Sequence, residues 1–269
     1  MKHTSSTQAL ISLFSLLFSL LFSNLFADIA IYGDTQYNNE VHSQIVSAIV
    51  SHKPDIAFHS GDYSNYGKEQ SEYDNFFAIE KPLTDICPLY PAKGNHERSR
   101  ELFLANFPVL NGKTYYTVEH DSLLFIILDA TMGLKPLSEQ HTWLQQTLSA
   151  DSLTAKIIIM HYPVFSSGYH GTDMEVSLFF PTMIKGYNVV MVSSGHDHDY
   201  ERLEYDGISY FVSGGSGGRL RDERNFLDFS KTFVNAHNYL ILSRDGKTLT
   251  VTAYALDGSI IESTEIRIP

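Results

Sequence analysis

Five short polar clusters, each placed directly after an apolar run, contain the residues of this sequence that could do chemistry. The clusters are Gly33-Asp34-Thr35-Gln36, Gly61-Asp62, Gly94-Asn95-His96-Glu97, His161-Tyr162-Pro163 and Gly195-His196-Asp197-His198. Their carboxylates, asparagine carbonyl and imidazoles form a mixed oxygen and nitrogen set, which suits Zn, Mn or Fe ions. The apolar runs predict strands, and the carboxyl ends of strands in an open α/β sheet share the edge where ligands bind. The sequence therefore predicts a metal site assembled from distant segments.

The candidate ligands outnumber those that one tetrahedral ion needs. They are Asp34, Asp62, Asn95, His161, His196 and His198. A pair of ions bridged by one carboxylate would use such a set, and two ions about 3.5–4 Å apart clamp both oxygens of an in-line phosphoryl displacement. A single Asp or His after a strand is more often a helix cap or a turn residue. The prediction therefore depends on all six occurring together, and it favours phosphoryl over acyl chemistry.

Apolar runs alternate with helical patterns along most of the chain, which predicts a layered α/β protein. Strands are expected near residues 28–33, 55–60, 88–92, 123–129, 156–161, 188–193 and 208–213, and helices near 40–52, 70–80, 138–149 and 174–186. After about residue 199 the pattern changes to strand pairs joined by turns at 244–247 and 256–259. No repeat or low-complexity linker divides residues 28–269, so a single domain is predicted.

The composition limits the partners of the protein. Nineteen basic and 31 acidic residues give a net charge of −12, which argues against a broad nucleic-acid or anionic-membrane surface because such partners favour positive charge. A phosphate-bearing substrate would need local positive charge, which bound cations can supply. Cys87 is the only cysteine, so no intrachain disulfide can form, and we expect it to be a small core residue.

Residues 1–27 differ from the rest of the chain. Lys2 and His3 precede an apolar run that ends in Leu25-Phe26-Ala27. This pattern predicts a signal peptide cleaved after Ala27, a catalytic domain over 28–269 and a secreted or periplasmic protein. An uncleaved N-terminal membrane anchor is the alternative, since the run is near the lower limit of about 17–20 residues for spanning a bilayer. No later stretch predicts a span.

The order of the five clusters resembles that of the calcineurin-like metallophosphoesterase superfamily. Within it, three segments are similar to the purple acid phosphatase branch: His161-Tyr162-Pro163-Val164-Phe165-Ser166-Ser167, the Gly-rich segment after Phe211-Val212, and Glu139-Gln140-His141-Thr142-Trp143-Leu144. The resemblance covers roughly residues 28–220. Five blocks in the family's order are specific, whereas one block alone would be weak.

The resemblance implies a four-layer αββα sandwich of two mixed β-sheets with two metal ions per chain, of Fe, Mn or Zn. It implies that Asp62 bridges the ions and that the other ligands divide between them: Asp34 and His198 on one, and Asn95, His161 and His196 on the other. A metal-bound hydroxide would be the nucleophile. His96 would face the substrate and donate a hydrogen bond or proton to the leaving oxygen.

The sequence departs from the family at the first metal site. Many members carry His two residues after the first Asp, where this chain has Gln36, whose neutral amide oxygen is a weaker ligand. Purple acid phosphatases use a Tyr three residues after the bridging Asp, but Asn65 stands there and Tyr66 follows. We expect Gln36 to complete the first site, with Tyr66 as the alternative, and we expect no purple colour.

The resemblance favours a phosphomonoesterase of the acid phosphatase type that acts on a small phosphate ester. A phosphodiesterase or nucleotide hydrolase using the same site is the alternative. Arg98, His170 and Arg219 are candidates for substrate binding, with Arg221 as the alternative to Arg219 after the Gly-rich segment.

Two other classes of protein are alternatives to a metal-dependent hydrolase. A metal-binding protein without turnover is one, but it leaves His96 without a role, since metal binding does not need it. The other is a serine hydrolase, because Gly214-Gly215-Ser216-Gly217-Gly218 matches the G-x-S-x-G pattern. Only a short β-rich tail with Asp222, Asp228 and His237 follows Ser216, so this reading is the least favoured.

Overall fold

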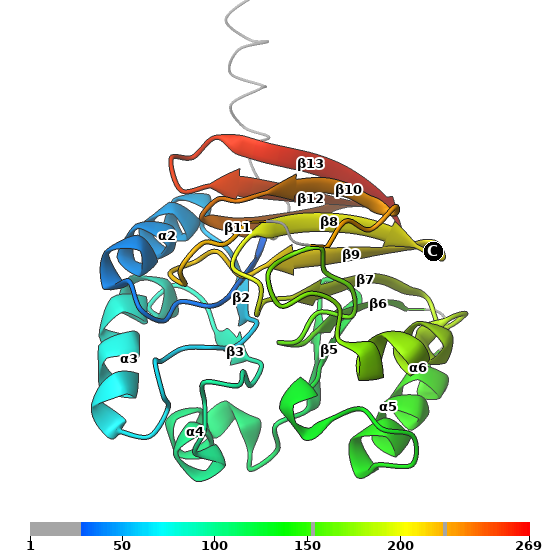
Figure 1. Ribbon diagram of the computed structural model, residues 1–269, viewed down its shortest axis with the longest axis horizontal. Helices are drawn as coiled ribbons and strands as arrows, with labels where there is room; N and C mark the ends of the chain where they lie inside the picture. The colour runs from blue at the N-terminus through cyan, green and yellow to red at the C-terminus, as the bar shows by residue number, and fades with distance from the viewer. Residues whose placement is uncertain (1–27, 152–153, 223–224) are drawn as a thin grey trace, which may run out of the picture.

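Two β-sheets face each other at the centre of the molecule, and helices cover their outer faces (Figure 1). The computed structural model describes residues 28–151, 154–222 and 225–269. The first sheet has the strand order β13-β12-β11-β1-β2-β3, and the second has the order β10-β8-β9-β7-β6-β5-β4. Both sheets contain parallel and antiparallel neighbours, so both are mixed.

In the first sheet, β1, β2 and β3 run parallel to one another, and β11 pairs antiparallel with β1. Its strands are β1 (Ile29–Tyr32), β2 (Ile56–His59), β3 (Leu89–Pro91), β11 (Asn238–Asp245), β12 (Thr248–Ala255) and β13 (Ile260–Arg267). The three parallel strands therefore end at one edge.

In the second sheet, β5, β6, β7 and β9 run parallel to one another, while β4, β8 and β10 pair antiparallel with their neighbours. Its strands are β4 (Tyr116–His120), β5 (Leu123–Ile127), β6 (Ala155–Ile159), β7 (Val189–Ser194), β8 (Tyr200–Tyr205), β9 (Ile208–Ser213) and β10 (Ser230–Val234). The carboxyl ends of its parallel strands also share an edge.

The largest hydrophobic core lies between the two sheets. Ile31 and Phe58 reach it from the first sheet, and Phe125 and Ile157 reach it from the second. The rings of Phe58 and Phe125 stack with their centroids 4.4 Å apart. Burying one such side chain stabilises the fold by about 1.5–3 kcal/mol. Strands buried on both faces read as continuous apolar runs, which is why these strands stand out in the sequence.

Helices close both outer faces of the sandwich. They are α2 (Asn39–His52), α3 (Gln70–Thr84), α4 (Arg100–Asn106), α5 (Glu139–Ala150) and α6 (Met174–Ile184). Ile45 of α2 and Leu83 of α3 pack in one cluster with Tyr32 of the first sheet. Leu144 of α5 and Phe180 of α6 pack in a separate cluster with the second sheet. The sequence of layers is helix, sheet, sheet, helix, which confirms the predicted fold.

The predicted elements are present with small differences at their ends. Each of the seven expected strands occurs within two residues of its predicted bounds, and the expected turns join β11 to β12 and β12 to β13. The helix expected at 70–80 continues to Thr84 and contains Pro82. The short helix α4 was not predicted; the side chain of Ser99 caps it by accepting a hydrogen bond from the Leu102 amide.

Three further predictions concern position in the molecule. Cys87 is buried, as expected, and is 5 % exposed. The predicted signal segment, residues 1–27, lies outside the described residues. Across residues 28–151, 154–222 and 225–269, none of the helices has the length and apolar character needed to cross a membrane.

Candidate metal centre

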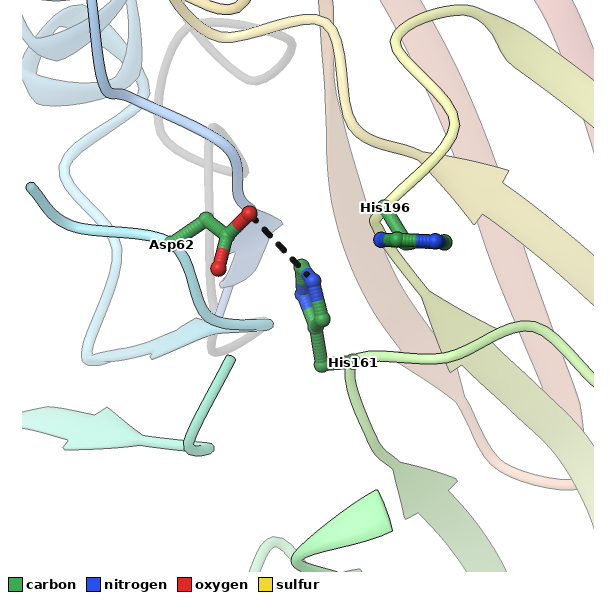
Figure 2. Close-up of side chains that lie close together, drawn as sticks. All are labelled: Asp62, His161 and His196. Carbon is green, nitrogen blue, oxygen red and sulfur yellow. Dashed lines mark ion pairs between the residues drawn. The ribbon is translucent and has the colours of Figure 1, made fainter. Parts of the chain in front are cut away.

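The five polar clusters meet where the parallel strands of both sheets end. The clusters after β1, β2 and β3 come from the first sheet, and those after β6 and β7 come from the second. The sequence predicts that all five clusters lie at the edge of a single sheet. The structure instead divides the clusters between two sheets whose edges adjoin. Figure 2 shows Asp62 approaching from one side while His161 and His196 approach from the other. The sheet packing therefore determines the distances within the cluster.

Asp62 lies at the centre of the cluster. Its Oδ2 is 3.4 Å from Nε2 of His161, and one ligand atom each of Asp62, His161 and His196 lies within 4.8 Å of the others. His161 Nε2 is also 2.9 Å from Oδ1 of Asn95. Four of the six predicted ligands are therefore within a few ångströms of one point.

The other two predicted ligands adjoin this group. Oδ1 of Asp34 is 3.5 Å from Nε2 of His198, and the backbone amide of His196 donates to the Asp34 carboxylate at 3.0 Å. Gln36 lies between the two parts, with its Nε2 3.2 Å from Asp62 Oδ2 and 3.4 Å from His198 Nε2. The structure thus brings all six predicted residues and Gln36 together.

The histidine rings are oriented by backbone carbonyls. Nδ1 of His161 donates to the carbonyl of Ser60 at 3.1 Å, and Nδ1 of His198 donates to the carbonyl of Arg219 at 2.9 Å. In each ring Nε2 is then the nitrogen that faces the carboxylates. Metal-binding histidines are commonly held in this way, because the second hydrogen bond fixes both tautomer and ring direction.

Three of the gathered residues have left-handed backbone conformations. The φ angles are 59° at Asp34, 62° at Asp62 and 70° at His196. Non-glycine residues at positive φ are uncommon, and sparsely populated backbone conformations cost about 1–3 kcal/mol each and cluster at functional sites. Three residues of one cluster therefore share an uncommon backbone conformation.

Two glycines allow the backbone to approach the carboxylates closely. A Cβ atom on Gly195 would lie 2.0 Å from Oδ2 of Asp34, and one on Gly94 would lie 2.2 Å from Oδ1 of Asp62. Both distances are far below van der Waals contact. Only glycine fits at these two positions without moving a carboxylate.

Glu97 stabilises the loops that carry Asp62 and Asn95. Its buried carboxylate accepts hydrogen bonds from the backbone amides of Asp62, Tyr63 and Gly94, at 2.9–3.0 Å. Burial, with the nearby Asp62 carboxylate, raises the pKa of Glu97 to about 8. Glu97 therefore connects the loops after β2 and β3.

Mutual electrostatics hold Asp62 and His161 in opposite charge states in the metal-free protein. Burial alone would raise the pKa of Asp62, but His161 outweighs burial and holds that pKa well below its usual range. Burial alone would lower the pKa of His161, but the Asp62 carboxylate raises it to about 9. Burial, together with His161 and His170, lowers the pKa of His196 to about 2. The ionised Asp62 carboxylate thus makes its side of the cluster favourable for a positive charge.

His96 lies at the rim of the cluster. Its Nε2 is 3.8 Å from Oδ2 of Asp62, its Nδ1 donates to the Asn65 carbonyl at 2.6 Å, and its side chain is 17 % exposed. The ring of Tyr37 packs edge-on against it at 5.6 Å. Nε2 is therefore directed toward the centre and reachable from outside, as its predicted role requires.

The two candidates for the last ligand of the first site occupy different environments. The side chain of Gln36 is 2 % exposed and contacts Asp62 and His198, whereas Tyr66 is 54 % exposed. The ring of Tyr66 packs beneath the guanidinium of Arg98, at 5.3 Å. Gln36 is thus the candidate that lies inside the cluster.

The three predicted substrate-binding residues lie near the cluster in different ways. Arg98 is exposed and packs on Tyr66, and Arg219 contributes its carbonyl to His198. His170 stacks on His196, with ring centroids 4.2 Å apart. These positions leave their roles toward a substrate as predictions.

Two residues contact His170 at this edge of the site. The buried Oδ1 of Asp197 accepts from the backbone amide of His170 at 2.8 Å and bonds to Nδ1 of the same residue at 3.0 Å. Arg221, the alternative to Arg219 at the end of the Gly-rich segment, has its Nη1 3.3 Å from Nε2 of His170 and its guanidinium 4.0 Å above the Tyr169 ring.

Ser216 has the environment of a structural residue. It is fully buried, and its hydroxyl donates to the backbone carbonyl of Asn238 at 3.0 Å, while its amide donates to the Gly33 carbonyl. The segment also passes close to Thr35, since a Cβ on Gly217 would lie 2.5 Å from its carbonyl oxygen. This arrangement offers no exposed serine nucleophile.

The residues present fit a metal centre. Among the described residues, the buried Oε1 of Gln36 has no hydrogen-bond partner, and a buried polar atom left without a partner costs about 1–3 kcal/mol. A half-turn of the amide would exchange its oxygen and nitrogen and direct the oxygen at the cluster, where a cation would satisfy it. Carboxylates, imidazoles and amide oxygens form a donor set suited to Zn, Mn or Fe.

Comparison with known proteins identifies the class. A family model described as calcineurin-like phosphoesterase matches residues 27–200, and the chain belongs to this family. Its curated relatives include Purple acid phosphatase 15 of Arabidopsis thaliana, which is 24 % identical over 242 residues, with 71 % of this chain and 45 % of the relative covered. The chain is thus similar to the purple acid phosphatase branch.

A second curated relative and one solved structure show the same similarity. Probable inactive purple acid phosphatase 27 of Arabidopsis thaliana is 26 % identical over 214 residues, with 62 % of this chain and 35 % of the relative covered. The structure of a purple acid phosphatase from yellow lupin (Lupinus luteus) seeds superposes with a TM-score of 0.77 at 18 % identity, covering 91 % of this chain and 54 % of that chain. This chain spans less than half the length of the two Arabidopsis relatives.

Proposed function

We propose that this chain is a metal-dependent phosphomonoesterase of the acid phosphatase type. The observation that carries the proposal is the gathering of Asp62 and five other polar side chains from five loops, in a chain of the calcineurin-like phosphoesterase family. The positive φ angles of Asp34, Asp62 and His196 support it, because sparsely populated backbone conformations cluster at functional sites.

Two ions of Fe, Mn or Zn would be held here, with Asp62 available to both. One would be held by Asp34, His198 and the amide oxygen of Gln36. The other would be held by the residues that surround His161, namely Asn95, His161 and His196. When bound, such a pair of cations lowers the pKa of a coordinated water and neutralises the charge on a phosphate group.

The residues of the chain itself orient the substrate and supply the proton. His96 can donate from Nε2 to the leaving oxygen, because its Nδ1 is committed to the Asn65 carbonyl. His170 is held by Asp197 through Nδ1 and stacked on His196, and its Nε2 accepts from Arg221, so His170 would position the Arg221 guanidinium to donate to a phosphate at the cluster. Arg98, which packs on Tyr66, would be a second cation for the same phosphate.

Export belongs to the same proposal. Residues 1–27 would act as a signal peptide cleaved after Ala27, and the catalytic domain would comprise residues 28–269 in the periplasm or outside the cell. An N-terminal membrane anchor is the alternative. The apolar character of the segment supports both readings, and N-terminal sequencing of the exported protein distinguishes them.

Elemental analysis combined with a substrate panel tests the proposed activity. We expect about two metal ions per chain, hydrolysis of aryl phosphate monoesters faster than diesters from acid to neutral pH, and loss of both metal and turnover after chelation. Faster hydrolysis of diesters would replace the monoesterase with a phosphodiesterase on the same site. Full activity in a metal-free sample would contradict the proposal.

A metal-binding protein without turnover is the second candidate, and Gln36 favours it. A neutral amide replaces the imidazole that many family members carry, and one relative is named as probably inactive. A fully metal-loaded sample that hydrolyses no monoester or diester would support this candidate. A turnover that falls in the variant His96→Asn without loss of metal would exclude it.

A further inference from the structure

A polar cavity lies behind the metal centre, between the amino-terminal parts of α2 and α3. Its volume is about 480 Å³, and its walls come from the loop after β1, the start of α2, the loop after β2 and the first turns of α3. Both helices stand on the same side of the molecule in Figure 1. The cavity falls in the size range of small-molecule sites, about 300–1,000 Å³.

The cavity shares a wall with the metal centre. Gln36 lines it, and the amide of the same residue lies 3.2 Å from Asp62 Oδ2. Tyr37 also lines it, and the Tyr37 ring contacts His96 edge-on at 5.6 Å. A group bound in this cavity would therefore lie beside the residue proposed to protonate the leaving oxygen.

Two buried polar groups of the wall lack partners. The side chains of Gln36 and Ser64 are only 2 % and 4 % exposed, and within the described part of the chain neither Gln36 Oε1 nor Ser64 Oγ has a hydrogen-bond partner. A half-turn of the Gln36 amide would give Oε1 to a cation, but it would place the amide nitrogen, a donor, where Oε1 now lies. Both atoms are closed to solvent, so the groups that a ligand can contact are the exposed polar side chains of the wall.

The other described residues that line the cavity offer a ligand no charged group without partners. No lysine or arginine of the described residues lines the cavity. Glu72 does, but its carboxylate accepts the backbone amides of Tyr66, Lys68 and Glu69. His42 also lines the cavity and bonds to the buried Glu80 carboxylate at 2.6 Å. Asn65 and Asn75 add neutral amides: Asn75 exchanges two hydrogen bonds with Asn39, at 3.1 and 3.2 Å, and Asn65 Oδ1 accepts from the Tyr37 amide. A second phosphate would find no lysine or arginine here, and an apolar group would displace water from the exposed amides without replacing its hydrogen bonds.

We propose that this cavity binds the alcohol portion of the phosphate ester, and that this alcohol is an uncharged molecule with several hydroxyl groups, such as a sugar or another polyol. The inference rests on the proposed phosphatase function and adds a substrate class to it. Hydroxyls can bond to the exposed polar side chains that line the cavity, which are Asn38, Asn39, Asn65, Ser71 and Asn75. A site built for such hydrogen bonds discriminates against analogues that lack them.

A pair of esters with the same carbon frame tests the preference. Glucose 6-phosphate and cyclohexylmethyl phosphate both carry a six-membered ring and a CH₂–O–P linkage, but only the first has ring hydroxyls. We expect kcat/KM to be at least about tenfold higher for glucose 6-phosphate, since each hydrogen bond contributes a factor of about five. Equal or reversed values would overturn the polyol assignment while leaving the phosphatase function intact.

A variant of a residue that lines the cavity tests whether the substrate preference arises there. Asn75→Leu replaces an exposed polar residue of α3 that lines the cavity, and we expect it to reduce the ratio of the two kcat/KM values about fivefold. Gln146→Leu makes a comparable change on the exposed face of α5, away from the cavity, and should leave the ratio unchanged. An unchanged ratio in Asn75→Leu would place the preference elsewhere and overturn the proposal.

A binding measurement separates this proposal from the phosphatase function. Saturation-transfer NMR with millimolar glucose and metal-free protein requires no turnover. We expect transfer to glucose that weakens in Asn75→Leu and persists in Gln146→Leu. If neither ester is hydrolysed but this transfer is seen, the phosphatase function fails and the polyol site stands; absence of transfer to the unaltered protein overturns the site.

Discussion

The two halves of the metal centre differ in the ligands that they offer. One half, here called the imidazole half, consists of Asn95, His161 and His196; the other, the mixed half, consists of Asp34, Gln36 and His198. Asp62 lies between them and belongs to both. Each half has one neutral amide, from Asn95 or Gln36; the imidazole half adds two nitrogen ligands, whereas the mixed half adds one nitrogen ligand and the Asp34 carboxylate.

This difference predicts unequal affinity for metal. In the mixed half the Asp34 carboxylate also accepts the backbone amide of His196 at 3.0 Å, so part of its charge is already used. Gln36 supplies no charge and must turn its amide to present oxygen. The imidazole half should therefore fill first, and the mixed half should decide whether the chain is a two-metal enzyme.

Asp62→Asn should have the largest effect because it removes the group that both halves share. We expect less than half of the normal metal content and a loss of turnover of about 1,000-fold or more, since the charge that holds both ions is gone. Elemental analysis and kcat with an aryl phosphate measure the two effects. Asp257→Asn, in the exposed turn between β12 and β13, is the control; full metal in Asp62→Asn would contradict the shared role.

His96→Asn should separate chemistry from metal binding. His96 approaches Asp62 only to 3.8 Å, so both halves should keep their ions while turnover falls about 100-fold through loss of the general acid. Aryl esters with better leaving groups need less protonation and should lose less. A variant that lost metal in proportion to activity would assign His96 to one of the halves instead.

Gly195→Ala should disturb the mixed half most, with a smaller effect on the imidazole half because His196 is the next residue and its amide donates to Asp34. The new Cβ would lie 2.0 Å from Oδ2 of Asp34, so the carboxylate must move, and overpacking of this kind costs about 1–3 kcal/mol of stability. We expect one ion per chain to be retained and the midpoint of denaturant unfolding to fall. Loss of both ions would show that the halves are not independent.

Substitutions of Gln36 should have the smallest effect, and they test the ligands of the mixed half most specifically. Gln36→His should raise the affinity of the second ion about tenfold and Gln36→Ala should lower it by a similar factor, because imidazole is the stronger ligand. Isothermal titration of metal into the apo protein measures both. Tyr66→Phe, at the exposed ring beneath Arg98, should change nothing; the reverse result would make Tyr66 the ligand.

The strands and their polar ends could be predicted because the signals are local. Apolar runs such as Ile56–His59 are buried on both faces and followed by Gly61-Asp62, so strand and site appear together in the sequence. The short helix α4 was missed because only seven residues and one cap define it. Its apolar pattern is too short to separate from a loop.

The supporting contacts could not be predicted because they join residues that only the tertiary fold brings together. The carbonyl of Arg219 holds His198, Asp197 holds His170, and Arg221 approaches His170 from the end of a Gly-rich segment. No spacing rule marks a backbone carbonyl as a partner for an imidazole. The cavity behind Gln36 likewise depends on how α2 and α3 pack.

Hydrogen bonds of the metal centre also join the two sheets at one end of the sandwich. His161 Nδ1 donates to the Ser60 carbonyl, the His196 amide donates to the Asp34 carboxylate, and the Gly218 amide donates to the Asp34 carbonyl at 2.7 Å, each across the boundary between the sheets. Sliding of one sheet over the other would break all three bonds. The loop amides of His196 and Gly218 should therefore exchange hydrogen as slowly as the strands of the core, which would make them direct reporters of sheet separation.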